Sequence, residues 1–105
     1  MTIIGRWDSS MKTPIGSVRA TFVFDEVDGE LRGVAEGATE VVELRDLVVE
    51  RQHDGSELVR WSQSVTKPMR LNLDFEVTIA GDSLDGFSRA GRLPRSVVTG
   101  KREPS

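Results

Sequence analysis

Two polar residues, Asp46 and Gln63, could do chemistry within a set of otherwise apolar side chains. Each falls at a position of its expected strand where alternation points the side chain inward. A carboxylic acid enclosed by apolar groups can act as a general acid or base, and a glutamine amide can orient a carbonyl group. The sequence therefore predicts Asp46 and Gln63 as candidate catalytic residues.

A second interpretation of Asp46 stays open, because the segment around it has an insecure register. Residues 41–51 carry apolar side chains at both parities, for example Val48 next to Val49. A β-bulge within the sequence RDL would turn Asp46 outward, since one extra residue moves the following side chains to the other face. An inward Asp46 could also serve only to pair with a neighbouring arginine.

Other catalytic chemistries find little support in the residue types. The chain has no cysteine and a single histidine, which argues against disulfides, a Cys nucleophile and a His-based metal site. His53 falls in the turn sequence QHDGS, so we expect it at the surface. We therefore expect no cofactor and no metal, and any enzymatic activity would be cofactor-independent.

The composition predicts one soluble globular domain over residues 1–105. Hydrophobic residues make up 37% of the chain and charged residues 30%, and the net charge is −3. The charges are interspersed, so we expect no nucleic-acid partner. No apolar stretch approaches the length of a membrane helix, and no secretory signal pattern is visible, so we expect no membrane partner and a cytoplasmic location.

Alternation of apolar and polar residues predicts an all-β protein. The clearest strand is 71–79, in which Leu71, Leu73 and Phe75 alternate with polar residues. The predicted strands cover residues 5–11, 17–25, 31–35, 41–51, 57–65, 71–79, 84–90 and 95–102. Such strands can form a sandwich or a closed barrel. Short Asp-Gly turns favour antiparallel neighbours, and we predict an eight-stranded antiparallel up-and-down β-barrel.

The two halves of the chain contain similar sequence segments. Trp7 and Trp61, the two tryptophans, are 54 residues apart (61 − 7). The residues matched at this spacing include Arg6 with Arg60, Ser10 with Ser64 and Pro14 with Pro68. This predicts a 4+4 internal pseudo-repeat, with halves of about 5–52 and 57–102 and a short tail over 103–105. The alternative is that β-strands simply resemble one another.

Gly5-Arg6-Trp7 resembles the Gly-x-Trp motif of lipocalins and other calycin barrels, and Arg102 lies where these families place an arginine across the tryptophan. Most of the chain resembles small bacterial lipocalin-like barrel domains. The resemblance implies that Trp7 and Arg102 close one end of the barrel. The other end would be the mouth, formed by the loops 12–16, 36–40, 66–70 and 90–94.

The inward residues predict a cavity. The candidate ligand-binding residues are Met11, Phe22, Trp61, Phe75 and Ser9. Small inward residues, among them Ala35, Gly33, Gly86 and Ser88, could leave room for a ligand or could fit the taper of a filled barrel. Both interpretations stay open. On the exterior, Val23, Leu47 and Val49 would form an apolar strip if they point outward, which favours a homodimer.

The resemblance also implies a function. Small bacterial barrels of this kind include cofactor-free cyclases of polyketide biosynthesis, which need mainly shape and the exclusion of water. We therefore expect a barrel that binds a small hydrophobic molecule, or a cofactor-free cyclase or isomerase with a polyketide-like substrate. The alternative is a non-catalytic accessory or protein-interaction barrel with a filled core.

Overall fold

The computed structural model describes residues 3–13, 16–38, 40–66 and 70–104, and within these ranges the chain forms strands and turns without a helix. The strands are β1 (Gly5–Thr13), β2 (Gly16–Val27), β3 (Glu30–Glu36), β4 (Val41–Glu43), β5 (Arg45–Arg51), β6 (Glu57–Val65), β7 (Leu71–Ala80), β8 (Ser83–Arg89) and β9 (Ser96–Arg102). No helix in the described ranges could span a membrane.

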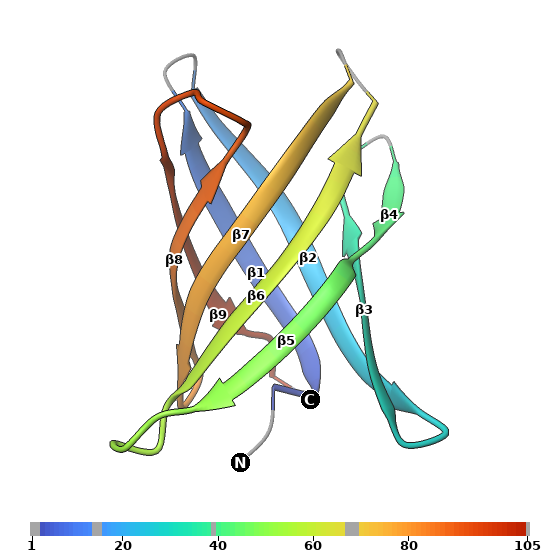
Figure 1. Ribbon diagram of the computed structural model, residues 1–105, viewed down its shortest axis with the longest axis vertical. Helices are drawn as coiled ribbons and strands as arrows, with labels where there is room; N and C mark the ends of the chain where they lie inside the picture. The colour runs from blue at the N-terminus through green and yellow to red at the C-terminus, as the bar shows by residue number, and fades with distance from the viewer. Residues whose placement is uncertain (1–2, 14–15, 39, 67–69, 105) are drawn as a thin grey trace.

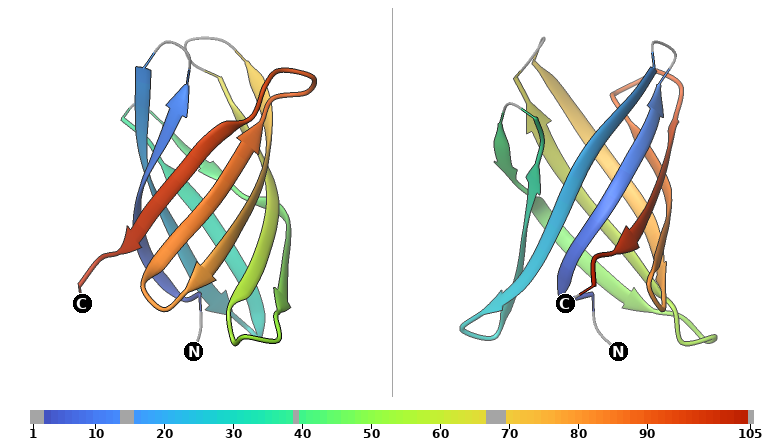
Figure 2. Two further views of the ribbon diagram at one scale, coloured as in Figure 1. Left: turned by 90° about the vertical axis from the view of Figure 1, so that its left-hand side faces the viewer. Right: turned by 180° about the vertical axis from the view of Figure 1, so that it is seen from behind.

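The strands form a single antiparallel sheet that curls into a nearly closed barrel (Figure 1, Figure 2). Their order is β4-β3-β2-β1-β9-β8-β7-β6-β5, and every pair of neighbours is antiparallel. The two ends of the sheet, β4 and β5, follow each other in the chain with only Leu44 between them. The two ends of the sheet are therefore joined by the chain, as it passes from pairing with β3 to pairing with β6, but they are not paired with each other, and the barrel is nearly closed.

The structure has nine strands, so the prediction of eight was wrong, and the difference lies in the segment 41–51. Asp46 adopts a φ of 55°, and the pairing of β5 with β6 shifts between Arg45 and Val48. This irregularity is a β-bulge, which bends the strand and changes its side-chain parity. The outward interpretation of Asp46 is thereby confirmed.

The change of parity also corrects the expected positions of Leu47 and Val49. Both pack against the core, whereas Val48 between them is 50% exposed. Val23 is half-buried. The exterior apolar strip of Val23, Leu47 and Val49, which favoured a homodimer, is therefore not formed in this structure.

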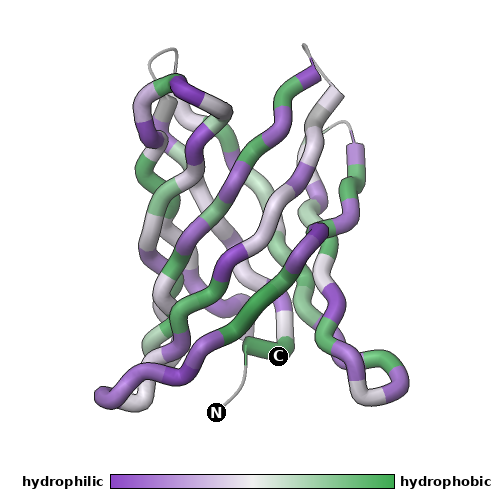
Figure 3. Tube along the Cα trace, viewed as in Figure 1, coloured by the Kyte–Doolittle hydropathy of each residue, from purple (hydrophilic) through white to green (hydrophobic). Residues whose placement is uncertain are grey.

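The core follows the alternation of the remaining strands, which Figure 3 shows as alternating hydrophobic and hydrophilic segments along the chain. In β7, Leu73, Phe75, Val77 and Ile79 are buried. Phe75 stacks on Trp61 with ring centroids 4.9 Å apart and an interplanar angle of 9°. Phe22 packs edge-on against both rings, at 5.1 Å from Trp61 and 5.6 Å from Phe75. Such aromatic contacts add to the stabilisation from burial alone.

One end of the barrel is closed by Trp7 and Arg102, at the end where both termini lie (Figure 1). The Arg102 guanidinium lies 4.4 Å from the centroid of the fully buried Trp7 ring, as the resemblance to calycin barrels implies. The indole Nε1 of Trp7 donates a hydrogen bond to the carbonyl oxygen of Ile3, at 2.9 Å. Arg102 also pairs with Asp82, at 3.0 Å, and donates to the carbonyl oxygen of Ile4. We call Ile3, Trp7 and Arg102 the closed-end cluster.

Hairpin turns also lie at the closed end, and the turn 90–94, one of the loops predicted for the mouth, lies at the other (Figure 2). Asp28 and Gly29 connect β2 and β3 with φ values of 52° and 81°, the two positive values that a type I′ hairpin turn needs. His53 is exposed in the turn between β5 and β6, as expected from the sequence. Residues 14–15, 39 and 67–69 of the predicted mouth loops lie outside the described residues.

Two of the small inward residues are explained by packing and leave no room for a ligand. A Cβ atom at Gly86 would lie 2.6 Å from the Cα atom of Val77 and closer still to the Glu76 carbonyl oxygen. A Cβ atom at Gly33 would lie 2.8 Å from a side-chain carbon of Leu44. At these two positions the small residues therefore fit the taper of a filled barrel.

Gly86→Ala is expected to lower the free energy of unfolding by about 2 kcal/mol, because the backbone of β7 must move away from the new methyl group. Urea denaturation followed by tryptophan fluorescence measures this change. Gly37→Ala is the control, since its Cβ atom would meet its nearest neighbour at an ordinary 3.6 Å. Equal stability of the two variants would contradict the close approach at Gly86.

Candidate ligand-binding cavity

A cavity of about 440 Å³ occupies the half of the barrel opposite the closed-end cluster. Its walls are mainly apolar and include Met11, Phe22, Ala35, Val42, Leu73 and Phe75. The exposed residues Gly37 and Ala38, between β3 and β4, also line it, so the cavity opens at the mouth. A volume of this size lies within the usual range of small-molecule sites.

Four of the five residues predicted to bind a ligand line this cavity. They are Ser9, Met11, Phe22 and Phe75. Trp61 does not line it, because its ring lies stacked against Phe75 and is 2% exposed. Trp61 therefore supports the cavity wall through Phe75 and would sense a ligand only through that ring.

The structure separates the two candidate catalytic residues. Gln63 is buried and lines the cavity, whereas Asp46 is exposed on the outside of the barrel. Asp46 lines a separate outer groove of about 330 Å³ together with Arg60, Asp74 and Phe87. Because the bulge turns Asp46 outward, the expectation of an inward Asp46 carboxylate was wrong.

The orientation of the Gln63 amide follows from its partner. Trp61 Nε1 donates a hydrogen bond to Gln63 Oε1 at 2.9 Å. An indole N–H can only donate, so the amide oxygen must face Trp61 and the NH₂ group must point elsewhere. Within the described residues that NH₂ group has no hydrogen-bond acceptor. No fully enclosed side-chain nitrogen or oxygen described by the structure lacks a partner, so the Gln63 NH₂ group is not fully enclosed, and the residue that carries it lines the cavity.

The buried hydroxyl groups near the cavity donate their hydrogen bonds to groups within the protein. Ser9 Oγ donates to the carbonyl oxygen of Ala20 at 2.8 Å, across the β1–β2 pair. Ser88 Oγ donates to the sulfur of Met11 at 2.8 Å, which fixes that side chain in the wall. Among the buried lining side chains that the structure describes, Gln63 therefore offers the donor that a ligand could use.

Near the mouth, side chains close the seam where β4 faces β6. The described residues show no backbone hydrogen bond between these two strands. Instead, the Glu40 carboxylate accepts hydrogen bonds from the backbone N–H of Thr66 at 2.9 Å and from its hydroxyl at 2.7 Å. Arg45 donates to Ser64 Oγ at 2.9 Å. Glu40 also lines the cavity, and the sequence did not point to it because it precedes a strand, where alternation predicts nothing.

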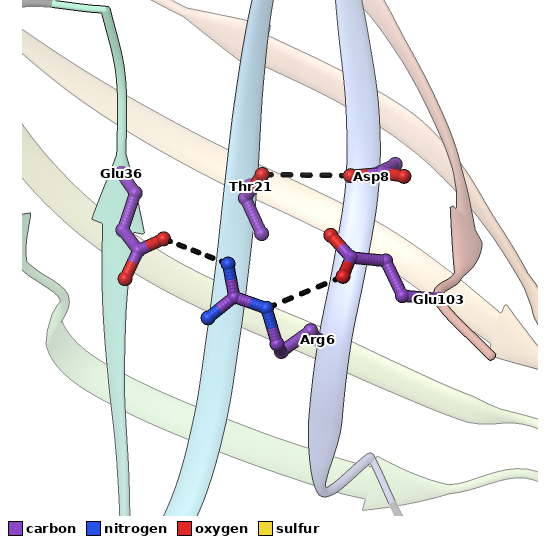
Figure 4. A network of polar contacts seen from close by, with 5 residues as sticks. All are labelled: Arg6, Asp8, Thr21, Glu36 and Glu103. Carbon is purple, nitrogen blue, oxygen red and sulfur yellow. Dashed lines mark hydrogen bonds and ion pairs between the residues drawn. The ribbon is translucent and has the colours of Figure 1, made fainter. Parts of the chain in front are cut away.

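The main ion pairs lie on the outside of the barrel. Arg6 on β1 reaches Glu36 on β3 at 3.0 Å and Glu103 at 3.3 Å, beside the Asp8–Thr21 contact (Figure 4). The hydrogen bond from Arg6 to Glu36 and the negative charge of that residue raise the pKa of Arg6. These pairs join β1 to β3 across β2 and to the segment after β9, and the three residues do not line the cavity.

Comparisons of the chain with protein-family models, with curated proteins and with solved structures find no match. The fold class is therefore an all-β, nearly closed antiparallel barrel, defined by the strand order alone. The candidate site is defined by the cavity and by the single amide that faces it.

Proposed function

We propose that this protein binds a small hydrophobic molecule inside its barrel. The observation that supports the proposal is the cavity lined by Phe22 and Phe75, which is open at the mouth and walled mainly by apolar side chains. Removing an apolar ligand from water into such a site is favourable, at roughly 25 cal/mol per Å² of buried apolar surface. A barrel that served only as an accessory or interaction domain would need no such space.

The cofactor-free cyclase or isomerase activity with a polyketide-like substrate is a finer form of the same proposal. Asp46 lies outside the barrel, so cyclisation in the cavity would depend on shape, on the exclusion of water and on the Gln63 N–H groups. We also propose that the protein is lipocalin-like. The barrel fold and the contact between Trp7 and Arg102 support this proposal. The internal repeat, the homodimer and the cytoplasmic location stay predictions.

Tryptophan fluorescence tests binding, because Trp61 lies against the Phe75 ring of the cavity wall. Titration with N-phenyl-1-naphthylamine is expected to give a saturable 1:1 change in Trp61 emission and in the emission of the probe. The variant Trp7→Phe keeps Trp61 as the one tryptophan and assigns the signal to it. A folded protein that gives no saturable signal would contradict the proposal and favour a filled barrel.

A further inference from the structure

We propose that the ligand carries a neutral hydrogen-bond acceptor, such as a ketone, ester or lactone carbonyl, which binds the NH₂ group of Gln63. This inference rests on the proposed function and names the class of ligand that the cavity would select. It follows from the direction in which Trp61 holds the amide and from the absence of charged side chains among the buried residues described.

The Gln63 amide is held in one orientation. A flipped amide would place its NH₂ group 2.9 Å from the indole nitrogen of Trp61, so that two donors would face each other. Trp61 is itself fixed by stacking on Phe75 and by edge contacts with Phe22 and Phe24. The donor is therefore directed into the cavity before any ligand arrives, and its orientation costs nothing on binding.

The apolar surroundings of Gln63 make this hydrogen-bond donor important for the choice of ligand. Gln63 lies opposite Leu73 on β7, and it is 5% exposed among mainly apolar groups. A purely apolar ligand that displaced water from the NH₂ group would leave a buried donor without a partner, which is unfavourable. A carbonyl oxygen would satisfy it, in surroundings of low polarity that strengthen the hydrogen bond.

The buried wall also favours a neutral acceptor over a carboxylate. The buried polar residues that the structure describes are Ser9, Ser56, Gln63 and Ser88, and none of these carries a charge. An ionised carboxylate next to Gln63 would lose its hydration and receive one neutral amide in exchange. Arg19 lines the cavity but is exposed, so it does not supply a buried cation.

Two probes of nearly equal shape test the inference: 2-acetylnaphthalene, which has a carbonyl group, and 2-ethylnaphthalene, which lacks it. Their affinities are measured by displacement of N-phenyl-1-naphthylamine. Gln63→Met removes the donor at similar volume and is expected to weaken binding of the ketone about tenfold, while binding of the hydrocarbon stays equal or becomes tighter because no donor is left unpaired. Gln52→Met is the control: it makes the same change at an exposed glutamine that does not line the cavity, so it should leave the ketone-to-hydrocarbon ratio unchanged.

A second measurement uses the unmodified protein and so does not depend on the folding of a variant. Gln63 and Gln52 are the two glutamines of the chain, and Gln52 is exposed. In ¹⁵N-labelled protein, the ketone is expected to move the side-chain NH₂ signals of Gln63 downfield while those of Gln52 stay in place. The hydrocarbon should produce a smaller shift at Gln63.

The outcomes separate this inference from the proposed function. If both probes bind but Gln63→Met leaves their affinity ratio unchanged, and the Gln63 signals respond equally to both, the acceptor inference is overturned and the binding function stands. If the dye does not bind and neither probe changes the NMR signals of Gln63, the proposed function fails together with the inference.

Discussion

Trp7→Ala is expected to lower the free energy of unfolding by about 3–5 kcal/mol, the largest effect on stability that we expect from a single substitution. The Trp7 ring is fully buried and carries the Arg102 guanidinium on its face, and its N–H group bonds to Ile3. Truncation therefore leaves a large void at the closed end and an arginine without its aromatic partner. A loss of this size is a large part of the stability of a small domain. Urea denaturation measures the change.

Arg102→Met distinguishes the contribution of the positive charge to stability from that of apolar packing at the closed end. It is expected to destabilise the protein less than Trp7→Ala, because the methionine still covers the ring. The control is Arg32→Met, which removes the same charge from an exposed pair with Glu30. If Trp7→Ala unfolds at the same urea concentration as Arg32→Met, the closed-end cluster does not hold the barrel together.

Ala35→Leu is expected to weaken binding of N-phenyl-1-naphthylamine by at least about tenfold, because the larger side chain fills space that the ligand needs. Ala35 lines the cavity and is the register partner of Phe22. Ala35 is buried in the core and borders the cavity, so thermal denaturation has to show that the variant still folds. Dye titration measures the loss of affinity.

Ala80→Leu is the matched control for the substitution at Ala35. Ala80 is exposed at the end of β7 and does not line the cavity. This variant should bind the dye as the unmodified protein does. Undiminished affinity in Ala35→Leu would show that the dye binds somewhere other than this cavity.

Much of the barrel could be predicted from the sequence, because a strand with one buried face alternates strictly. In β7 the buried residues Leu73, Phe75 and Val77 lie at the alternate positions expected. Met11 and Phe22 were expected inside on the same grounds, and both line the cavity. Alternation needs no knowledge of neighbouring strands, so it succeeds wherever the register is regular.

The segment 41–51 could not be predicted in this way, because its course depends on a backbone conformation that hydrophobicity does not encode. The chain changes partner from β3 to β6 between Glu43 and Arg45, which divides the expected strand into two and raises the count from eight to nine. The bulge at Asp46, with its positive φ, then turns Asp46 outward and brings Leu47 and Val49 toward the core.

The role of Gln63 was only partly visible in the sequence. Trp61 and Gln63 are two residues apart on one strand, so their side chains share a face, and this spacing is the signal for their contact. The direction of the amide, however, depends on which atom of Gln63 meets the indole N–H. That knowledge requires the structure.

The most direct test of the binding cavity is methyl NMR of protein labelled with ¹³C at alanine and methionine methyl groups, titrated with 2-acetylnaphthalene. The methyl signals of Met11, Ala20 and Ala35, which line the cavity, are expected to shift along one saturable curve while that of exposed Ala80 stays in place. Absence of any shift at Met11 and Ala35, or an equal shift at Ala80, would contradict a ligand-binding cavity at this position.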